Sequence, residues 1–169
     1  CEIARAVKIL YDQGLNIEIR FVGENWGGYG KKFLSLIESL DPNHDFLIWK
    51  GFEPFEELHI SYKDCDTFVF GSTCENLPNI LLEAMASSLP IASSNYGPMP
   101  EILRDGGLYF DPENPDSIAL AIKNIVDDES LAKELACKAN KYGSEYFWKR
   151  CSTETFSFIT DTFERFDFD

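Results

Sequence analysis

The chain has 169 residues, of which 44% are hydrophobic, and its 15 basic and 29 acidic residues give a net charge of −14. A chain of this length suits one domain, which buries about 70% of the surface that the unfolded chain exposes. The negative charge argues against binding to nucleic acid, because such binding needs clustered Lys and Arg to replace counterions. It still allows a small phosphorylated ligand, which backbone N–H groups and one or two cations can hold.

Neither the apolar runs nor the cysteines suggest export or membrane insertion. No apolar run approaches the ~20 residues that cross a bilayer, and the N-terminus lacks a targeting pattern. The five cysteines are widely spaced and include no C-x-x-C pair. We interpret them as reduced thiols that pack as small hydrophobic side chains, and we expect a cytoplasmic protein.

Apolar periodicity predicts helices that alternate with short strands along the whole chain. Gly14 is placed to end the first helix as a C-terminal cap. Pro78 is placed to begin an apolar helix, since a proline in the first helical position loses no hydrogen bond. The predicted elements are a helix at Cys1–Gln13, a strand at Leu15–Val22, a loop at Gly23–Gly30, a helix at Lys31–Leu40, a strand at Phe46–Trp49, a helix at Phe55–Tyr62, a strand at Thr67–Phe70, a helix at Pro78–Ser87, a strand at Pro90–Ser93, a loop at Ser94–Pro100, a helix at Glu101–Arg104, a strand at Leu108–Phe110, and helices from Pro115 with breaks near Asp127 and Gly143.

This alternation predicts an α/β fold with a doubly wound, parallel, Rossmann-like sheet and helices on both faces. In such sheets, ligands bind outside the carboxyl ends of the strands. Three loops therefore become the expected ligand-binding segments, namely Gly23–Gly30, Gly71–Leu77 and Ser94–Pro100.

Several familiar motifs are absent or incomplete. A P-loop over Gly23–Lys32 would need Gly at position 25 and Ser or Thr at position 32, where the chain has Asn25 and Lys32. Asp64-Cys65-Asp66 has the D-x-D form of some metal sites, but it precedes its strand and so lies away from the expected ligand edge. His44 and His59 lack zinc-ligand spacing, and there is no G-x-S-x-G elbow. We predict no bound metal.

The segment from Gly71 to Glu83 leaves a strand, turns and enters a helix whose first N–H groups and positive dipole end suit a diphosphate. Glu75 precedes this helix and Glu83 lies about five residues into it, or about 7–8 Å along the axis. Carboxylates can accept hydrogen bonds from sugar hydroxyls. Spacing alone is equally compatible with a pair that has no role in binding, in which Glu75 complements the helix dipole and Glu83 is a solvated surface residue. The apolar surroundings of Glu83 favour a functional pair, because a buried charge needs a partner.

These two glutamates resemble the E-x7-E motif of family 4 glycosyltransferases, which are retaining enzymes of the two-domain GT-B architecture. The resemblance extends in family order over almost the whole chain. Its other parts are Asp66–Ser72, Glu83-Ala84-Met85-Ala86, Leu89–Ser93, Gly97–Ile102, Gly106–Phe110 and Phe147-Trp148.

The resemblance implies a donor site for a UDP-, GDP- or ADP-sugar, with retained anomeric configuration, a glycan or lipid-linked acceptor, and neither metal nor cofactor. It assigns the catalytic position to Glu75, which would contact hydroxyls of the donor sugar. The other donor-binding residues would be Glu83 at the ribose, the backbone of Asn76 and Leu77 beside the sugar and diphosphate, and Gly51 and Phe52 at the base. Many family members have Gly-Phe-Gly where this chain has Asn76-Leu77-Pro78.

The resemblance also implies that residues 1–169 are the C-terminal donor-binding domain, with 145–169 as its terminal helix and tail. The family's first strand, the Arg and Lys after it, and the acceptor domain are then outside this sequence. We therefore expect weak donor binding and no transfer by these residues alone, and a peripheral place at the inner membrane face for the full-length protein. Exposed Phe163, Phe166 and Phe168 would favour self-association.

Two other functions are compatible with an acidic α/β chain. A sugar-nucleotide epimerase of related shape would need catalytic acids and a histidine that the sequence does not place. A non-catalytic, receiver-like interaction module would need an acidic cluster at the strand ends, where the chain instead has Gly23, Lys50, Gly71 and Ser94.

Overall fold

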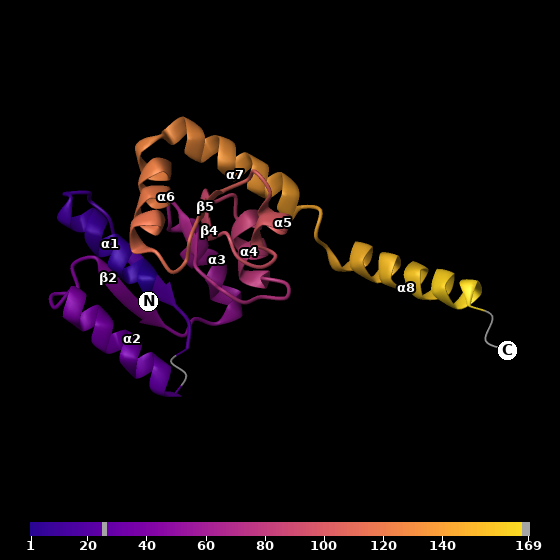
Figure 1. The fold of residues 1–169 in the computed structure, drawn as a ribbon, viewed down its shortest axis with the longest axis horizontal. Coiled ribbons are helices and arrows are strands. Elements are labelled where there is room, and N and C mark those ends of the chain that lie inside the picture. The colour runs from indigo at the N-terminus through magenta and orange to yellow at the C-terminus, as the bar shows by residue number, and fades with distance from the viewer. Residues whose placement is uncertain (25–26, 167–169) are drawn as a thin grey trace.

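The computed structural model describes residues 1–24 and 27–166. Its strands form two sheets, each made of parallel strands, and helices flank both sheets (Figure 1). The two-stranded sheet pairs β1 (Ile19–Val22) with β2 (Leu47–Gly51). The three-stranded sheet has the order β3-β4-β5, formed by Phe68–Phe70, Ile91–Ser94 and Leu108–Phe110. The predicted α/β class with parallel strands and helices on both faces is confirmed.

Eight helices occur among the described residues. The helices are α1 (Glu2–Asp12), α2 (Gly27–Leu40), α3 (Phe55–Lys63), α4 (Asn79–Ala86), α5 (Met99–Leu103), α6 (Pro115–Asp127), α7 (Glu129–Gly143) and α8 (Trp148–Arg165).

Two of the boundaries that differ from the prediction are the starts of β1 and α2. The strand predicted from Leu15 begins only at Ile19, because the N–H of Leu15 donates to the carbonyl of Leu10 at 3.1 Å and completes the C-terminal cap of α1. The N–H of Gly14 donates to Tyr11 in the same cap, with φ at +86°, as its predicted role requires. The second helix begins at Gly27 instead of Lys31. Asn25, used in the P-loop comparison, lies outside the described residues.

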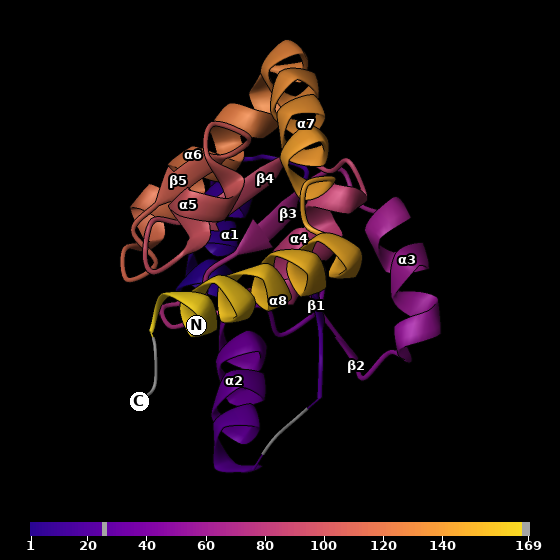
Figure 2. The ribbon, with the colours of Figure 1, turned by 90° about the vertical axis from the view of Figure 1, so that its right-hand side faces the viewer.

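Alternating side chains of the three-stranded sheet belong to two separate cores. On one face, Val69, Ala92 and Phe110 join the core that contains α1, α2 and α6. On the other face, Phe68 and Ile91 join the core built around α4, α5 and α7. Every residue of β4 is buried because the strand has helices on both sides, as Figures 1 and 2 show.

Asp41 organises the connection from α2 into β2. Its side chain is 2% exposed, and its carboxylate accepts hydrogen bonds from the backbone N–H groups of Asp45, Phe46 and Leu47 at 2.8–2.9 Å. Burial alone would raise the pKa of Asp41, but the three N–H donors outweigh it and hold the pKa below its ordinary value. The carboxylate thus fixes the start of the strand that ends at Gly51.

We expect Asp41→Ala to lower the free energy of unfolding by about 3 kcal/mol, because it leaves buried N–H donors unpaired. Since the folded pKa is depressed, the stabilisation by Asp41 is present above the unfolded pKa and is lost as the pH falls through the folded pKa. Urea unfolding of the wild type and Asp41→Asn should therefore differ more at neutral than at strongly acidic pH. Asp45→Ala, an exposed change in the same connection, should have little effect. Equal stability of the wild type and both Asp41 variants at neutral pH would contradict this account.

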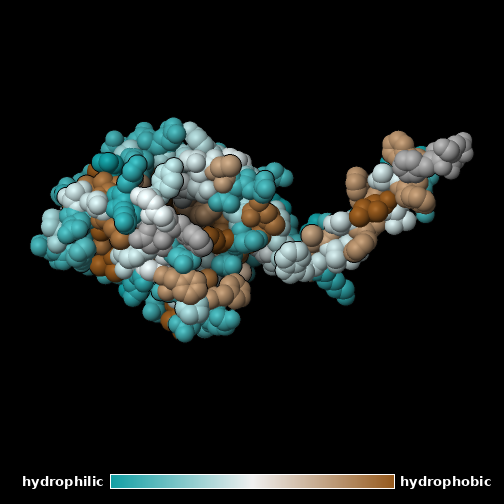
Figure 3. Space-filling model, turned by 90° about the horizontal axis from the view of Figure 1, so that it is seen from below, coloured by the Kyte–Doolittle hydropathy of each residue, from teal (hydrophilic) through white to brown (hydrophobic). Residues whose placement is uncertain are grey.

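Helix α8 extends away from the rest of the molecule and has no buried residue (Figure 1). Phe163 and Phe166 are 70% and 62% exposed, as expected, whereas Phe168 lies outside the described residues. Apolar residues at spacings of three, four and three form one face of the helix, which we call the α8 stripe, and the apolar character of this arm is visible in Figure 3. The α8 stripe consists of Phe156, Ile159, Phe163 and Phe166. None of the helices in the described residues is both long and apolar enough to cross a membrane.

We expect the α8 stripe to drive concentration-dependent self-association, since an exposed apolar face is stabilised by burial against another. The double variant Phe156→Ser/Phe166→Ser should lower the weight-average mass in light scattering at the highest concentrations. Phe158→Ser is the matched control, because Phe158 is 71% exposed but lies off the stripe. A monomeric wild type at every concentration would contradict this prediction.

Candidate functional site

The turn between β3 and α4 is the part of the chain to which the sequence assigns the donor sugar. Gly71 begins it beside α1, and a Cβ there would lie 2.8 Å from the Cδ1 of Ile3, so a larger residue would require the Ile3 side chain to shift. Helix α4 begins at Asn79, one position later than predicted, and Pro78 is its N-cap, whose carbonyl accepts from Leu81 and Leu82 at 3.0 and 3.2 Å. No side chain caps this end of α4, so the N–H groups of its first turn point into the turn.

Glu83 is half-buried on α4 and has a specific partner. The hydroxyl of Tyr62, on α3, donates a hydrogen bond of 3.0 Å to Oε2 of Glu83. Burial, followed by the negative charge of Glu83 and the hydrogen bond to it, raises the pKa of Tyr62, which therefore stays a donor at neutral pH. Glu83 is thus a positioned carboxylate and not a freely solvated one.

A large cavity of about 1330 Å³, which we call the central cavity, lies between the two sheets. All residues of β1 and β3 line it, so the facing sides of the two sheets form part of its wall. Glu83, Tyr62 and Phe52 also line it. The central cavity therefore brings together two of the predicted donor-binding residues, Phe52 and Glu83.

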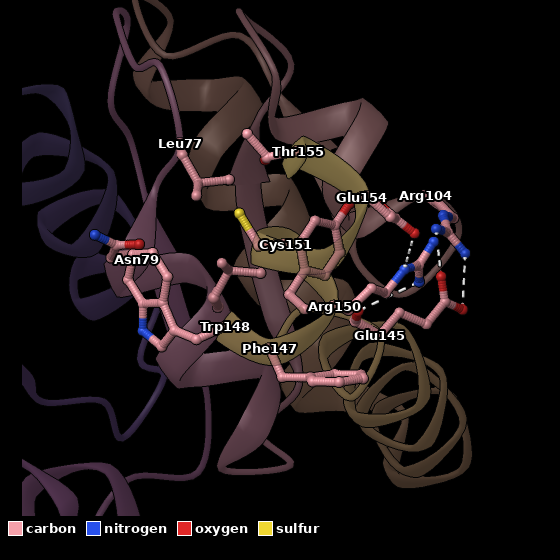
Figure 4. Close-up of a pocket in the computed structure, with 12 residues that line it drawn as sticks. Leu77, Asn79, Arg104, Glu145, Phe147, Trp148, Arg150, Cys151, Glu154 and Thr155 are labelled. Carbon is pink, nitrogen blue, oxygen red and sulfur yellow. Dashed lines mark hydrogen bonds and ion pairs between the residues drawn. The ribbon is translucent and has the colours of Figure 1, made fainter. Parts of the chain in front are cut away.

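A second cavity, of about 460 Å³, lies between α4 and the start of α8, and we call it the α8 cavity (Figure 4). Leu77 and Asn79 come from the turn and α4, and Trp148 comes from α8. Its two arginines are paired with carboxylates. Arg104 donates to Glu145 at 2.8 Å, and Arg150 donates to Glu154 at 2.7 Å. Leu77 therefore belongs to a different cavity from Glu83.

The remaining predicted residues lie outside these two cavities in the described part of the chain. Glu75 is half-buried within the turn, and Asn76 beside it is exposed. Gly51 ends β2 with a φ of +75°, a conformation that favours glycine, and it leads directly to the 68% exposed Phe52. Glu83 lines the central cavity and Glu75 lines neither cavity, so the donor-binding roles assigned to this pair stay predictions.

Sequence reasoning missed Tyr62 and Arg104. Tyr62 lies 21 residues before Glu83 on another helix, so no local pattern in the sequence connects the two residues. Arg104 caps α5 with a φ of +54° and stacks on the ring of Tyr142 at 4.6 Å. Its contacts come from residues about 40 positions later, which no local pattern reveals.

The described residues contain no group of three or more His, Cys, Asp or Glu side chains arranged to hold a metal ion. Asp64 and Asp66 lie before β3, at the opposite end of that strand from Gly71. Cys65 between them has its pKa raised by burial, so it is a neutral thiol at physiological pH.

Comparisons with known proteins agree with this arrangement. The family profile described as "Glycosyl transferases group 1" matches residues 2–143. Over 105 residues the chain is 31% identical to the O-antigen chain mannosyltransferase B of Escherichia coli, covering 62% of this chain and 28% of that protein. The chain spans less than half the length of the curated relatives that it matches.

Two solved structures show the same fold. HepE from Anabaena, solved in complex with UDP-glucose, superposes with a TM-score of 0.79 at 18% identity, over 95% of this chain and 44% of that one. The C-terminal domain of a glycosyl transferase group 1 family protein, LpcC, from Francisella tularensis gives a TM-score of 0.72 at 20% identity, over 85% of this chain and 76% of that one. With the profile match over most of its length, the chain belongs to the group 1 glycosyl transferase family.

Proposed function

We propose that this chain is the C-terminal, donor-binding domain of a retaining, family 4 glycosyltransferase of the GT-B architecture. The enzyme transfers a sugar from a nucleoside-diphosphate sugar to a glycan or lipid-linked acceptor. The observation that carries the proposal is the turn from Gly71 into α4, with Glu75 before the helix and Glu83 within it, inside a profile match that covers residues 2–143.

In this proposal the free N–H groups at the start of α4 bind the diphosphate. Glu75 accepts hydrogen bonds from hydroxyls of the donor sugar, and Glu83 accepts from the ribose. The backbone of Asn76 and Leu77 lies beside the sugar and diphosphate. Gly51 and Phe52 hold the base, with the exposed Phe52 ring offering a flat apolar surface. The placement of Phe52 and Glu83 on one cavity supports this division of roles.

We propose a UDP-, GDP- or ADP-linked hexose as the donor and no metal or cofactor. HepE, solved with UDP-glucose, and the mannosyltransferase relative support a nucleotide-linked hexose. The described residues offer the diphosphate a helix N-terminus but no cluster of metal ligands. Charge stabilisation of the leaving diphosphate then depends on backbone N–H groups and cations.

The acceptor side of the reaction lies outside this domain in our proposal. The chain covers 76% of the LpcC C-terminal domain but only 28% of the O-antigen mannosyltransferase, which supports its assignment as one half of a longer enzyme. We place the full-length enzyme in the cytoplasm. If its acceptor is lipid-linked, we place it peripherally at the inner face of the membrane.

Isothermal titration of the chain with UDP-glucose, GDP-mannose and ADP-glucose, each with a chelator present, tests the proposed function. Weak binding of one nucleotide family, unchanged by the chelator, is the expected result. The same donor should support transfer by the full-length enzyme, with no transfer by the 169-residue chain. Absence of binding for all three donors, or binding only with added divalent metal, would contradict the proposal.

Tyr62→Phe should weaken binding of the preferred donor about three- to tenfold, because the Glu83 carboxylate loses the hydroxyl that orients it. Tyr142→Phe is the matched control, since its hydroxyl also donates to a carboxylate, that of Asp105, on another part of the surface. Titration calorimetry of both variants makes the comparison. Equal affinity of the two variants would show that Glu83 does not need Tyr62.

A further inference from the structure

We infer that Glu53 selects guanine as the base of the donor, so that the donor is a GDP-sugar. The Glu53 carboxylate accepts hydrogen bonds from the N1–H and the 2-amino group of the base, beside the ring of Phe52. This inference rests on the proposed function, because it adds a partner for one end of the same nucleotide-sugar. It makes Glu53 a specificity-determining residue and leaves the roles of Glu75 and Glu83 unchanged.

The position of Glu53 in the fold places it at the base end of the site. It lies two residues beyond the carboxyl end of β2, and ligands bind at this edge of a parallel sheet. It directly follows Phe52, the residue proposed to hold the base, and both residues line the central cavity. Glu53 also precedes Pro54, and a residue before proline is restricted to extended conformations. The half-buried carboxylate is therefore carried by a backbone with few alternative states.

Helix α3 orients this carboxylate together with that of Glu83. The hydroxyl of Ser61 donates a hydrogen bond of 2.5 Å to Oε2 of Glu53. The next residue, Tyr62, donates to Oε2 of Glu83 at 3.0 Å. Two consecutive residues of one helix thus hold two carboxylates that line the same cavity. Since Glu83 is proposed to bind the ribose, and the base is bonded to the ribose, this arrangement supports the placement of Glu53 at the base.

The Glu53 carboxylate has acceptor positions left for a ligand. Among the residues that the structure describes, its Oε1 makes neither a hydrogen bond nor an ion pair. Its Oε2 accepts from Ser61 and keeps a second lone pair, because each carboxylate oxygen has two. The carboxylate can therefore accept two further N–H groups that lie side by side.

Among the common bases, guanine is the one that presents two such donors next to each other. Its N1–H and 2-amino group point in the same direction and match the two oxygens of a carboxylate. Adenine offers one amino group beside the N1 acceptor, and uracil offers one N–H between two carbonyl oxygens. A carboxylate would meet a lone pair at either of these bases, which is unfavourable for binding. The chemistry of Glu53 therefore favours GDP over ADP and UDP.

Titration calorimetry of the full-length enzyme with GDP, inosine diphosphate, UDP and ADP tests this selection. Inosine diphosphate differs from GDP only in lacking the 2-amino group. GDP should bind about 10- to 100-fold more tightly than inosine diphosphate, because one hydrogen bond to a charged group is lost. Tighter binding of UDP or ADP than of GDP would overturn the guanine assignment and leave the proposed function in place. Absence of binding by all four nucleotides would overturn both.

Glu53→Gln separates base recognition from a purely structural role of the carboxylate. The Gln amide has one oxygen and accepts one of the two N–H groups, so the preference for GDP over inosine diphosphate should fall to within about threefold. Loss of the contact to Ser61 alone would weaken both nucleotides equally and preserve the preference. Glu56→Gln is the matched control, since Glu56 is an exposed glutamate three residues later, and it should keep the wild-type preference. A Glu53→Gln enzyme with an unchanged preference would overturn the role of Glu53.

Discussion

Replacing Glu75 with Gln in the full-length enzyme should lower kcat/KM for sugar transfer about 10²–10⁴-fold. In the proposed site, the Glu75 carboxylate accepts hydrogen bonds from two sugar hydroxyls, and each bond to a charged group contributes roughly 1.5–3 kcal/mol. The neutral amide keeps the shape of the side chain but weakens both bonds. Initial rates with the preferred donor make the measurement.

The control for this variant is Glu113→Gln, an exposed glutamate in the turn between β5 and α6. It removes the same charge from a place with no proposed contact to the donor, and it should leave the rate unchanged. Transfer by Glu75→Gln within about threefold of the wild type would remove Glu75 from the catalytic position.

Gly107→Ala should lower the free energy of unfolding by about 3 kcal/mol, the upper part of the range for an overpacked core. A Cβ at Gly107 would lie 2.5 Å from Cδ2 of Leu103 and 2.7 Å from the carbonyl oxygen of Ile91. The Leu103 side chain can move, but the Ile91 carbonyl belongs to the buried strand β4 and cannot. The expected fall in melting temperature is roughly 6–12 °C for a domain of this size.

Gly28→Ala is the matched control, because a Cβ there has no described atom within 4 Å and the residue lies in the first turn of α2. Alanine at this position should leave stability unchanged or raise it by about 0.5 kcal/mol, since it loses less conformational freedom on folding. Thermal unfolding of both variants by circular dichroism gives the comparison. A Gly107→Ala protein as stable as Gly28→Ala would mean that β4 and α5 are packed less tightly than described.

The order of elements could be predicted from sequence because each signal is local. Gly14 predicted the end of α1 because its positive φ is part of the cap itself. The strand that begins at Ile19 was predicted four residues too early. Apolar periodicity cannot distinguish a strand residue from an apolar residue in a helix cap, and Leu15 is of the second kind. It packs against the core from within the cap of α1.

The partners of the site residues could not be predicted, because they come from elements distant in sequence. The sequence indicated that Glu83 needs a partner, since its neighbours Leu81 and Ala84 are apolar and prove to be fully buried. It did not indicate that the partner is Tyr62, which the packing of α3 brings to α4. The separation of Leu77 and Glu83 into two cavities likewise depends on where α8 leaves the fold.

The measurement that tests the central claim most directly is an NMR titration of the ¹⁵N-labelled chain with UDP-glucose and GDP-mannose. If the turn into α4 is the donor site, amide shifts should concentrate at Asn76, Leu77, Asn79 and Ile80, with smaller shifts near Phe52. The same titration of Glu83→Gln should show the same residues shifting at higher ligand concentration. Shifts confined to α8 or to the outer strands, or no shifts with either donor, would contradict the assignment of this turn as the donor site.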